Sequence, residues 1–377
     1  MSRARFGIDI IHHLTREFGE GELRGAVLNA VRTERERLPS DEGICAFARL
    51  TDYKLGWFNS DTVATENNEF FGTTSKTLKN TLVGVFEGFR YALVQRGDDC
   101  DVHLRQNGDA ARWTDSRQVM CALLRAIAFL HGRHAWPQWQ RIENGFDTTA
   151  EYTRAPRTIP RTIYTTLSED SGGDPALLIA KAAECFLREG DFGETLHHYL
   201  FLAREASANE TPHHAGALGL CAVFEGLITF LHSHGCGDTQ TPDEAEFEKA
   251  RSELKRYASE RAAIPDLAPT AAEMWKRFIG LIQSARPLRP LEKYRWLVEH
   301  LRLPLEATMP AFDVWKRHRN VLAHGMRPDG DNTDNLIVVS RVAGAINVMA
   351  AAALGYSGSA VLSRLEDRFV RIPEPRS

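Results

Sequence analysis

The sequence lacks the patterns of disulfide-rich, zinc-binding and strongly basic proteins. Its six cysteines form no Cys-x-x-Cys pair and none lies at zinc-finger spacing, which excludes the common structural zinc sites. We expect them to be buried, reduced thiols of a cytoplasmic protein. The net charge is −4, so no overall basic field attracts nucleic acid, and any such contact needs a local basic patch. The cysteines are Cys45, Cys100, Cys121, Cys185, Cys221 and Cys236.

The sequence also lacks a long uninterrupted apolar run. Spanning a bilayer takes about 18 apolar residues, and the two longest apolar stretches, Ala215 to Leu231 and Val338 to Leu354, contain polar or charged residues. The first residues are interrupted by charge and histidine too early for a signal peptide. We therefore expect no membrane contact and predict that both stretches are buried helices.

The length of 377 residues predicts two domains. Residues 1–150 carry a mixed pattern and are expected to form an α+β domain that senses or regulates. Residues 151–175 contain prolines and a Ser-Gly-Gly run, which predicts a linker that carries at most a strand. Residues 176–377 carry helical periodicity and short connections, which favour an antiparallel helical bundle. The predicted fold class is therefore mainly α, with a mixed N-terminal domain.

Within the first domain, four patterns are informative. Apolar residues at helical spacing predict a helix over 23–31, whereas the aromatic, turn-bounded segment 44–58 predicts strands. The run 83–94 fits both periods. A clearer helix is predicted to begin at Asp115 or Ser116 and to end near Gly132.

In the second domain we expect eight helices, of which the charged one over 244–261 should be exposed and laced with salt bridges. Their predicted bounds are 177–189, 194–205, 215–232, 244–261, 271–284, 291–301, 311–324 and 335–354.

One segment of the late helix carries the chemistry. On a helix, Lys316, Arg319, Asn320, Ala323 and His324 share one stripe because they follow the spacing i, i+3, i+4, i+7, i+8. Gly325 and Pro328 predict that the helix ends just after the stripe. The other side chains are expected to anchor the helix in the bundle: Trp315, Val321 and Leu322.

This stripe suits cleavage of an RNA phosphodiester, because RNA supplies its own nucleophile, the 2′-OH. The imidazole of His324 titrates near neutral pH and can act as general acid or base. Arg319 offers planar, bidentate donors to a phosphate, and Asn320 can orient either group.

The spacing Arg319-Asn320-x-x-x-His324 in a late helix of an all-α region resembles the HEPN superfamily. The local string through Gly325 is similar to HEPN domains of antiphage and abortive-infection proteins, including ApeA-like ones, over roughly residues 176–360. This resemblance implies a metal-independent, toxin-like endoribonuclease that works as a homodimer with a composite cleft and needs no cofactor. It implies that Arg319 and His324 are the catalytic pair and that Asn320 supports them.

Charged residues near the motif are expected to support the catalytic pair. An isolated carboxylate in the apolar stretch 215–231 is costly unless paired, so we expect Glu225 to pair with Arg319 or Lys316. Basic residues near the motif are expected to contact the RNA backbone. They are Lys293, Arg295, Arg317 and Arg327.

Other interpretations stay open. The bundle is alternatively a catalytically silent scaffold that binds RNA, a nucleotide or a protein partner, and the basic residues a solvated face. A metal-dependent hydrolase built on histidines is a third option, but His131 and His134 bring no obvious third ligand, so we expect no metal. For the N-terminal domain we consider a phage-derived or nucleotide trigger.

Overall fold

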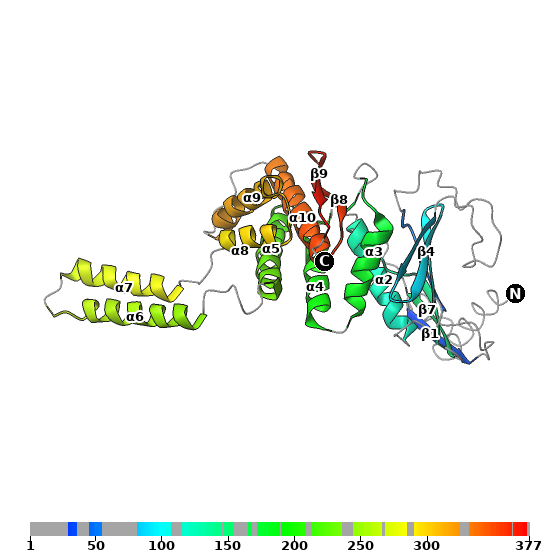
Figure 1. Ribbon diagram of the computed structural model, residues 1–377, viewed down its shortest axis with the longest axis horizontal. Helices are drawn as coiled ribbons and strands as arrows, with labels where there is room; N and C mark the ends of the chain where they lie inside the picture. Colours follow the sequence, from blue (N-terminus) through cyan, green and yellow to red (C-terminus); the bar gives the residue numbers. More distant parts are fainter. Residues whose placement is uncertain are drawn as a thin grey trace, which may run out of the picture.

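A computed structural model shows a mainly helical protein with an antiparallel sheet at one end, in agreement with the predicted class (Figure 1). The helices lie in the middle, and a helical hairpin protrudes at the other end. The structure describes residues 29–35, 45–54, 81–106, 115–144, 147–153, 165–167, 172–188, 190–208, 213–235, 244–265, 268–284, 290–323, 332–363 and 365–374.

The sheet is antiparallel throughout, with the order β1-β7-β6-β2-β5-β4-β3 among the described strands. The strands are β1 (Asn29–Arg35), β2 (Cys45–Leu50), β3 (Thr81–Phe86), β4 (Phe89–Arg96), β5 (Asp99–Gln106), β6 (Trp139–Asn144) and β7 (Asp147–Thr153).

The sheet settles two ambiguities of the sequence. Strand β2 confirms a strand in 44–58, and the run 83–94 is a hairpin of β3 and β4. Its turn residues Glu87 and Gly88 both have positive φ, 45° and 79°, as a two-residue hairpin turn requires. The helix predicted over 23–31 is wrong for residues 29–31, which belong to β1, because pairing with β7 supplies their hydrogen bonds. Residues 23–28 lie outside the described part.

Two helices, α2 (Ser116–His131) and α3 (Pro175–Leu187), pack on one face of the sheet. The predicted ends of α2 are confirmed. The side chain of Asp115 accepts a hydrogen bond from the backbone N–H of Arg117, and Gly132 ends the helix with a left-handed φ of 62°. Helix α3 packs along α2 as well as on β3, so it joins the sheet layer to the rest of the protein.

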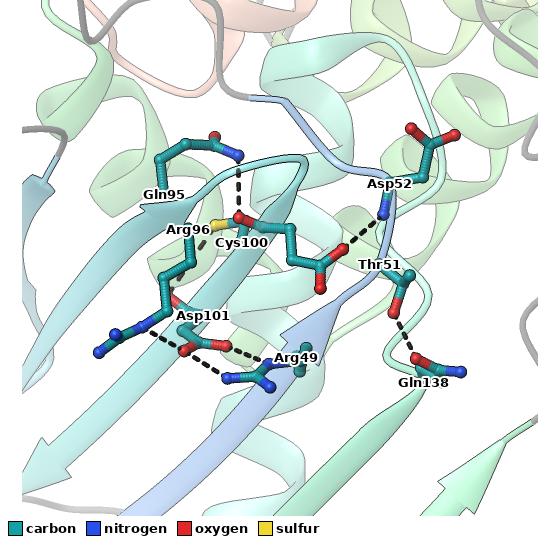
Figure 2. Close-up of polar contacts among 9 residues, drawn as sticks. Arg49, Thr51, Asp52, Gln95, Arg96, Cys100, Asp101 and Gln138 are labelled. Carbon is teal, nitrogen blue, oxygen red and sulfur yellow. Dashed lines mark hydrogen bonds and ion pairs between the residues drawn. The ribbon is translucent and has the colours of Figure 1, made fainter.

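A buried carboxylate braces three strands on the face away from α2 (Figure 2). Asp101 on β5 has only 3% of its side chain exposed. It accepts from Arg49 Nε at 2.6 Å and Nη2 at 2.8 Å, and it lies 2.8 Å from Nε of Arg96. Since a buried charge is costly unless paired, this cluster fixes β2 and β4 on β5.

The central helices are α5 (His213–Gly235) and α10 (Asn332–Ala353), which contact each other. Both are long and apolar enough to cross a membrane by length and composition, and 56% and 72% of their apolar windows are buried within the protein. This confirms that the two apolar stretches are buried helices. Around them lie α4 (Asp191–Ala206), α8 (Pro290–His300) and α9 (Leu305–Ala323).

A C-terminal hairpin, β8 (Gly358–Ser363) and β9 (Arg368–Ile372), packs on α10 and is a feature that the sequence did not predict. Ser340 and Ser363 are hydrogen-bonded through their hydroxyl groups at 3.1 Å in the buried contact. Strand β8 also reaches the segment expected to be a linker, because Val361 N–H donates to Thr166 O at 2.9 Å. The N–H of Thr166 in turn donates to Leu130 O on α2.

Helices α6 (Glu244–Ala262) and α7 (Pro269–Ser284) pack against each other and project from the body (Figure 1). The predicted exposed, salt-bridged character of α6 is confirmed by the pairs Arg251–Glu248 and Arg256–Glu260.

The described cysteines are free, but they are not all buried. Cys100 and Cys221 are buried and Cys185 is half-buried, whereas Cys121 is exposed on α2, so the expectation of burial is wrong there. The side chains of Cys45 and Cys236 lie outside the described part.

The contact between α10 and β8 predicts a strict requirement for glycine. A Cβ at position 344 would lie 1.8 Å from the carbonyl oxygen of Leu362. Gly344→Ala should therefore lower the free energy of unfolding by about 1–3 kcal/mol, or more if the backbone cannot shift. Urea unfolding followed by circular dichroism measures the change.

Gly280→Ala is the matched control, because a Cβ at this exposed position of α7 would meet no atom within 4 Å. It should be neutral or stabilise by up to about 1 kcal/mol through helix propensity. Equal stability of wild type and Gly344→Ala would show that the hairpin is not packed this closely on α10.

Candidate functional site

Arg319 and Asn320 of the motif lie near the end of α9, whereas His324 lies outside the described residues. The helix begins six residues earlier than expected. The sequence suggested a start at Ala311, directly after a proline, whereas α9 begins at Leu305 and contains Pro310. A proline inside a helix removes one backbone hydrogen bond and usually ends or bends the helix. Tyr294 supports this turn, since its hydroxyl donates to the carbonyl of Thr308 at 2.9 Å.

Trp315 fixes α9 on α5. Its side chain is only 2% exposed and contacts Phe224 and Phe312, with ring centroids 6.0 and 4.8 Å away. Its indole N–H donates to the carbonyl oxygen of Cys221 at 3.0 Å. A buried indole N–H needs such an acceptor, so this bond selects one position of α9 along α5. The predicted anchoring role of Trp315 is confirmed.

One turn further along both helices, Arg319 meets Glu225. The guanidinium donates through Nε to Oε2 at 3.0 Å and through Nη2 to Oε1 at 3.2 Å. The predicted pairing of Glu225 with Arg319 is therefore confirmed, and the partner is Arg319 rather than Lys316. A bidentate pair fixes the plane of the guanidinium as well as its position.

The same guanidinium lies over the Trp315 ring, with its central carbon 5.9 Å from the ring centroid. Arg319 keeps 46% of its side chain exposed and Glu225 keeps 27%. An arginine has five N–H donors, and the pair with Glu225 uses two of them. Arg319 is thus oriented by two neighbours and still offers donors to a ligand at the surface.

The sequence pattern predicted only an anchoring role for Trp315, whereas its ring also lies against the guanidinium of Arg319. The spacing Trp315-x-x-x-Arg319 carries the signal, since residues four apart lie on the same face of a helix. An arginine held over the face of a tryptophan ring is attracted to it by a cation–π interaction.

Burial shifts the pKa values of two residues on α5, Cys221 and His232. Burial, together with the charge of Glu225, raises the pKa of the Cys221 thiol to about 12, so this thiol stays protonated and unreactive. Burial lowers the pKa of His232, and the nearby charge of Lys293 lowers it further. Lys293 thus lies beside the end of α5, whereas Glu225 lies seven residues earlier, about 10 Å along the helix.

The remaining predicted site residues divide into two groups. Lys316 and Arg317 are exposed on α9 and Arg295 is exposed on α8, so they are open to a ligand, but no described contact brings them onto the Arg319–Glu225 pair. The side chain of Asn320 and the whole of His324 and Arg327 lie outside the described residues.

Within the described ranges, no group of three or more histidine, cysteine, aspartate or glutamate side chains is placed to hold a metal ion. Two histidines named in the sequence analysis have other environments. His131 is buried at the end of α2, and His134 Nε2 lies 2.5 Å from the carboxylate of Glu205.

Comparisons with protein-family models, with curated proteins and with solved structures found no match to this chain. The resemblance to HEPN domains therefore depends on the motif and its helical setting.

The exposure of the Arg319–Glu225 pair predicts that it contributes little to stability. In a double-mutant cycle with Glu225→Ala and Arg319→Ala, we expect a coupling below about 1 kcal/mol in the free energy of unfolding, because surface pairs are screened by water. Chemical denaturation of the four proteins measures it.

The bidentate pair of Arg341 and Glu366 is the matched control in the same chain, with side-chain exposures of 25% and 30%. A coupling at Arg319–Glu225 well above that of the control would show that the pair serves mainly to hold α5 and α9 together.

Proposed function

We propose that this protein is a metal-independent endoribonuclease of the HEPN type. The observation that carries the proposal is the bidentate pair between Arg319 and Glu225, which orients a half-exposed guanidinium from the Arg-Asn-x-x-x-His motif. A surface pair adds little stability, so we assign it the role of positioning a phosphate ligand for chemistry.

In the proposed reaction, the 2′-oxygen of a ribose attacks the adjacent phosphorus and the bond to the 5′-oxygen breaks. The imidazole of His324 moves the proton, as base toward the 2′-OH and as acid toward the leaving 5′-oxygen. The remaining N–H groups of Arg319 stabilise the charge on the phosphorane oxygens. The products are a 2′,3′-cyclic phosphate and a 5′-hydroxyl.

The other roles in the proposal are supporting. Asn320 orients the reacting groups, Glu225 positions Arg319, and Lys316 lies one turn before Arg319 on the exposed side of α9. The RNA backbone is held by basic side chains around the motif. These are Lys293, Arg295, Arg317 and Arg327.

We further propose that the active form is a homodimer with a composite cleft, in the cytoplasm, and that it damages RNA during phage defence. Residues 1–150 are proposed to sense the trigger, phage-derived or nucleotide. These statements follow from the resemblance of the motif.

The proposal predicts cleavage of a mixed RNA pool in EDTA by wild-type protein, with cyclic phosphate ends. His324→Ala and Arg319→Ala should each lower the rate at least about a hundredfold, the usual contribution of an acid–base or charge-stabilising group. Gel electrophoresis and end-group analysis of the products measure both effects. The full chain is used because α3 packs on α2 and β3, which a truncation at residue 176 would remove.

His214→Ala is the matched control, because this histidine is exposed in the first turn of α5, away from the motif. It should cut at the wild-type rate. Loss of cleavage in EDTA with recovery on adding a divalent metal would contradict the proposal, as would unchanged cleavage by His324→Ala. Failure of every protein to cut would favour the silent scaffold.

A further inference from the structure

A buried arginine on α4, outside the motif helix, has no ion-pair partner among the described residues. Arg204 lies in the last turn of α4, and only 6% of it is exposed. Its guanidinium forms no hydrogen bond or ion pair with any residue that the structure describes, and its Nε is fully enclosed without a partner. A charge buried in this way costs several kcal/mol unless something pairs with it.

The acceptors around Arg204 are used by other donors. The carbonyls of Ala203 and Arg204 accept from the hydroxyl of Ser207 at 2.7 and 3.2 Å. At the end of α2, the carbonyls of Phe129 and Leu130 accept from the side chain and the N–H of Thr166. The ends of α2 and α4 favour a cation through their partial charges, but they supply no full negative charge.

The charged neighbours do not compensate Arg204 either. The carboxylate of Glu205 lies 2.5 Å from Nε2 of His134, and no described hydrogen bond or ion pair joins it to Arg204. Burial lowers the pKa of Arg204 to about 10, against the effects of Tyr53 and Glu205. Burial, followed by the charges of Arg125 and Arg204, lowers the pKa of His197 to about 4.

Arg204 lines a small cavity where α2, α4 and α10 meet. Apolar side chains such as Phe129 and Leu200 form much of its wall, and Ser207 and Asn347 add polar groups. Asn347 comes from the middle of α10 and is 9% exposed. The cavity leaves about 10 Å³ for the centre of a water-sized particle, which is room for one small occupant.

We propose that this cavity is a binding site for a single monatomic anion of halide size, held by the guanidinium of Arg204. An anion supplies the missing charge, and the enclosed donors of Arg204 supply its hydrogen bonds. A monatomic ion matches the space of about 10 Å³ that the cavity leaves for the centre of an occupant. The bound ion joins the sheet layer, through α2, to α4 and α10. The site is independent of the proposed nuclease.

The test compares thermal unfolding in sodium chloride, sodium bromide and sodium gluconate at constant ionic strength. Gluconate is too large for the cavity. The midpoint of the wild type should rise with chloride, by about 5 °C at a hundredfold excess over the dissociation constant, because the anion binds only the folded state. Arg204→Met should lose this dependence. Arg256→Met, at an exposed arginine of α6 with 77% of its side chain accessible, should keep it.

Crystals of the wild type soaked in bromide should show an anomalous peak within hydrogen-bonding distance of Arg204. If Arg204→Met does not fold, Arg204→Lys should keep the dependence but need more chloride, because lysine lacks the planar fork. The proposal is overturned by a flat wild-type response, by an equal response in Arg204→Met, or by the absence of the bromide peak. Greater stability of Arg204→Met than of wild type in chloride also overturns it.

Discussion

The position of the candidate site depends on one hydrogen bond, from the indole of Trp315 to the carbonyl of Cys221. In a helix that carbonyl also accepts from the N–H of Glu225, four residues on. Arg319 likewise follows Trp315 by four residues. The buried contact and the ion pair are therefore one turn apart on both helices and advance in the same direction. A shift of α9 by one turn along α5 would break the bond from Trp315 to Cys221 and would at the same time separate Arg319 from Glu225. The buried anchor Trp315 therefore determines where the guanidinium lies.

Much of the helical part could be predicted, because its signals are local. Asp115 and Gly132 cap the two ends of α2, and capping needs no tertiary contact. The charged residues around α6 predict that this helix is exposed to solvent. The predicted start of α9 was wrong because a proline usually ends a helix, and Pro310 was therefore placed before it. In the structure, the packing of the first turns of α9 outweighs this local preference. The β8–β9 hairpin was missed because its stability comes from Gly344, which lets the strand approach α10 closely.

Part of the candidate site could also be predicted from the sequence. Glu225 stands in an otherwise apolar stretch, and the cost of an unpaired carboxylate there predicts a basic partner, which the pair with Arg319 supplies. Arg204 gave no comparable signal. In a helix with polar residues on one side, an arginine near the end is ordinarily solvated and favoured by the helix dipole. Its burial arises only because α2 and α10 close over the end of α4, which no periodicity within α4 reveals.

The two central helices show how a nearly apolar element acquires a defined orientation. Apolar side chains on α5 and α10 supply most of the buried surface, but such contacts tolerate rotation, because one aliphatic side chain replaces another at modest cost. Their polar exceptions do not tolerate it. Glu225 faces Arg319, Ser340 faces Ser363, and Asn347 lines the cavity of Arg204. Rotating α10 would leave the buried Ser340 or Asn347 unsatisfied, at a cost of about 1–3 kcal/mol each, and rotating α5 would separate Glu225 from Arg319. The few polar residues therefore select one packing from the several that the apolar surface would accept.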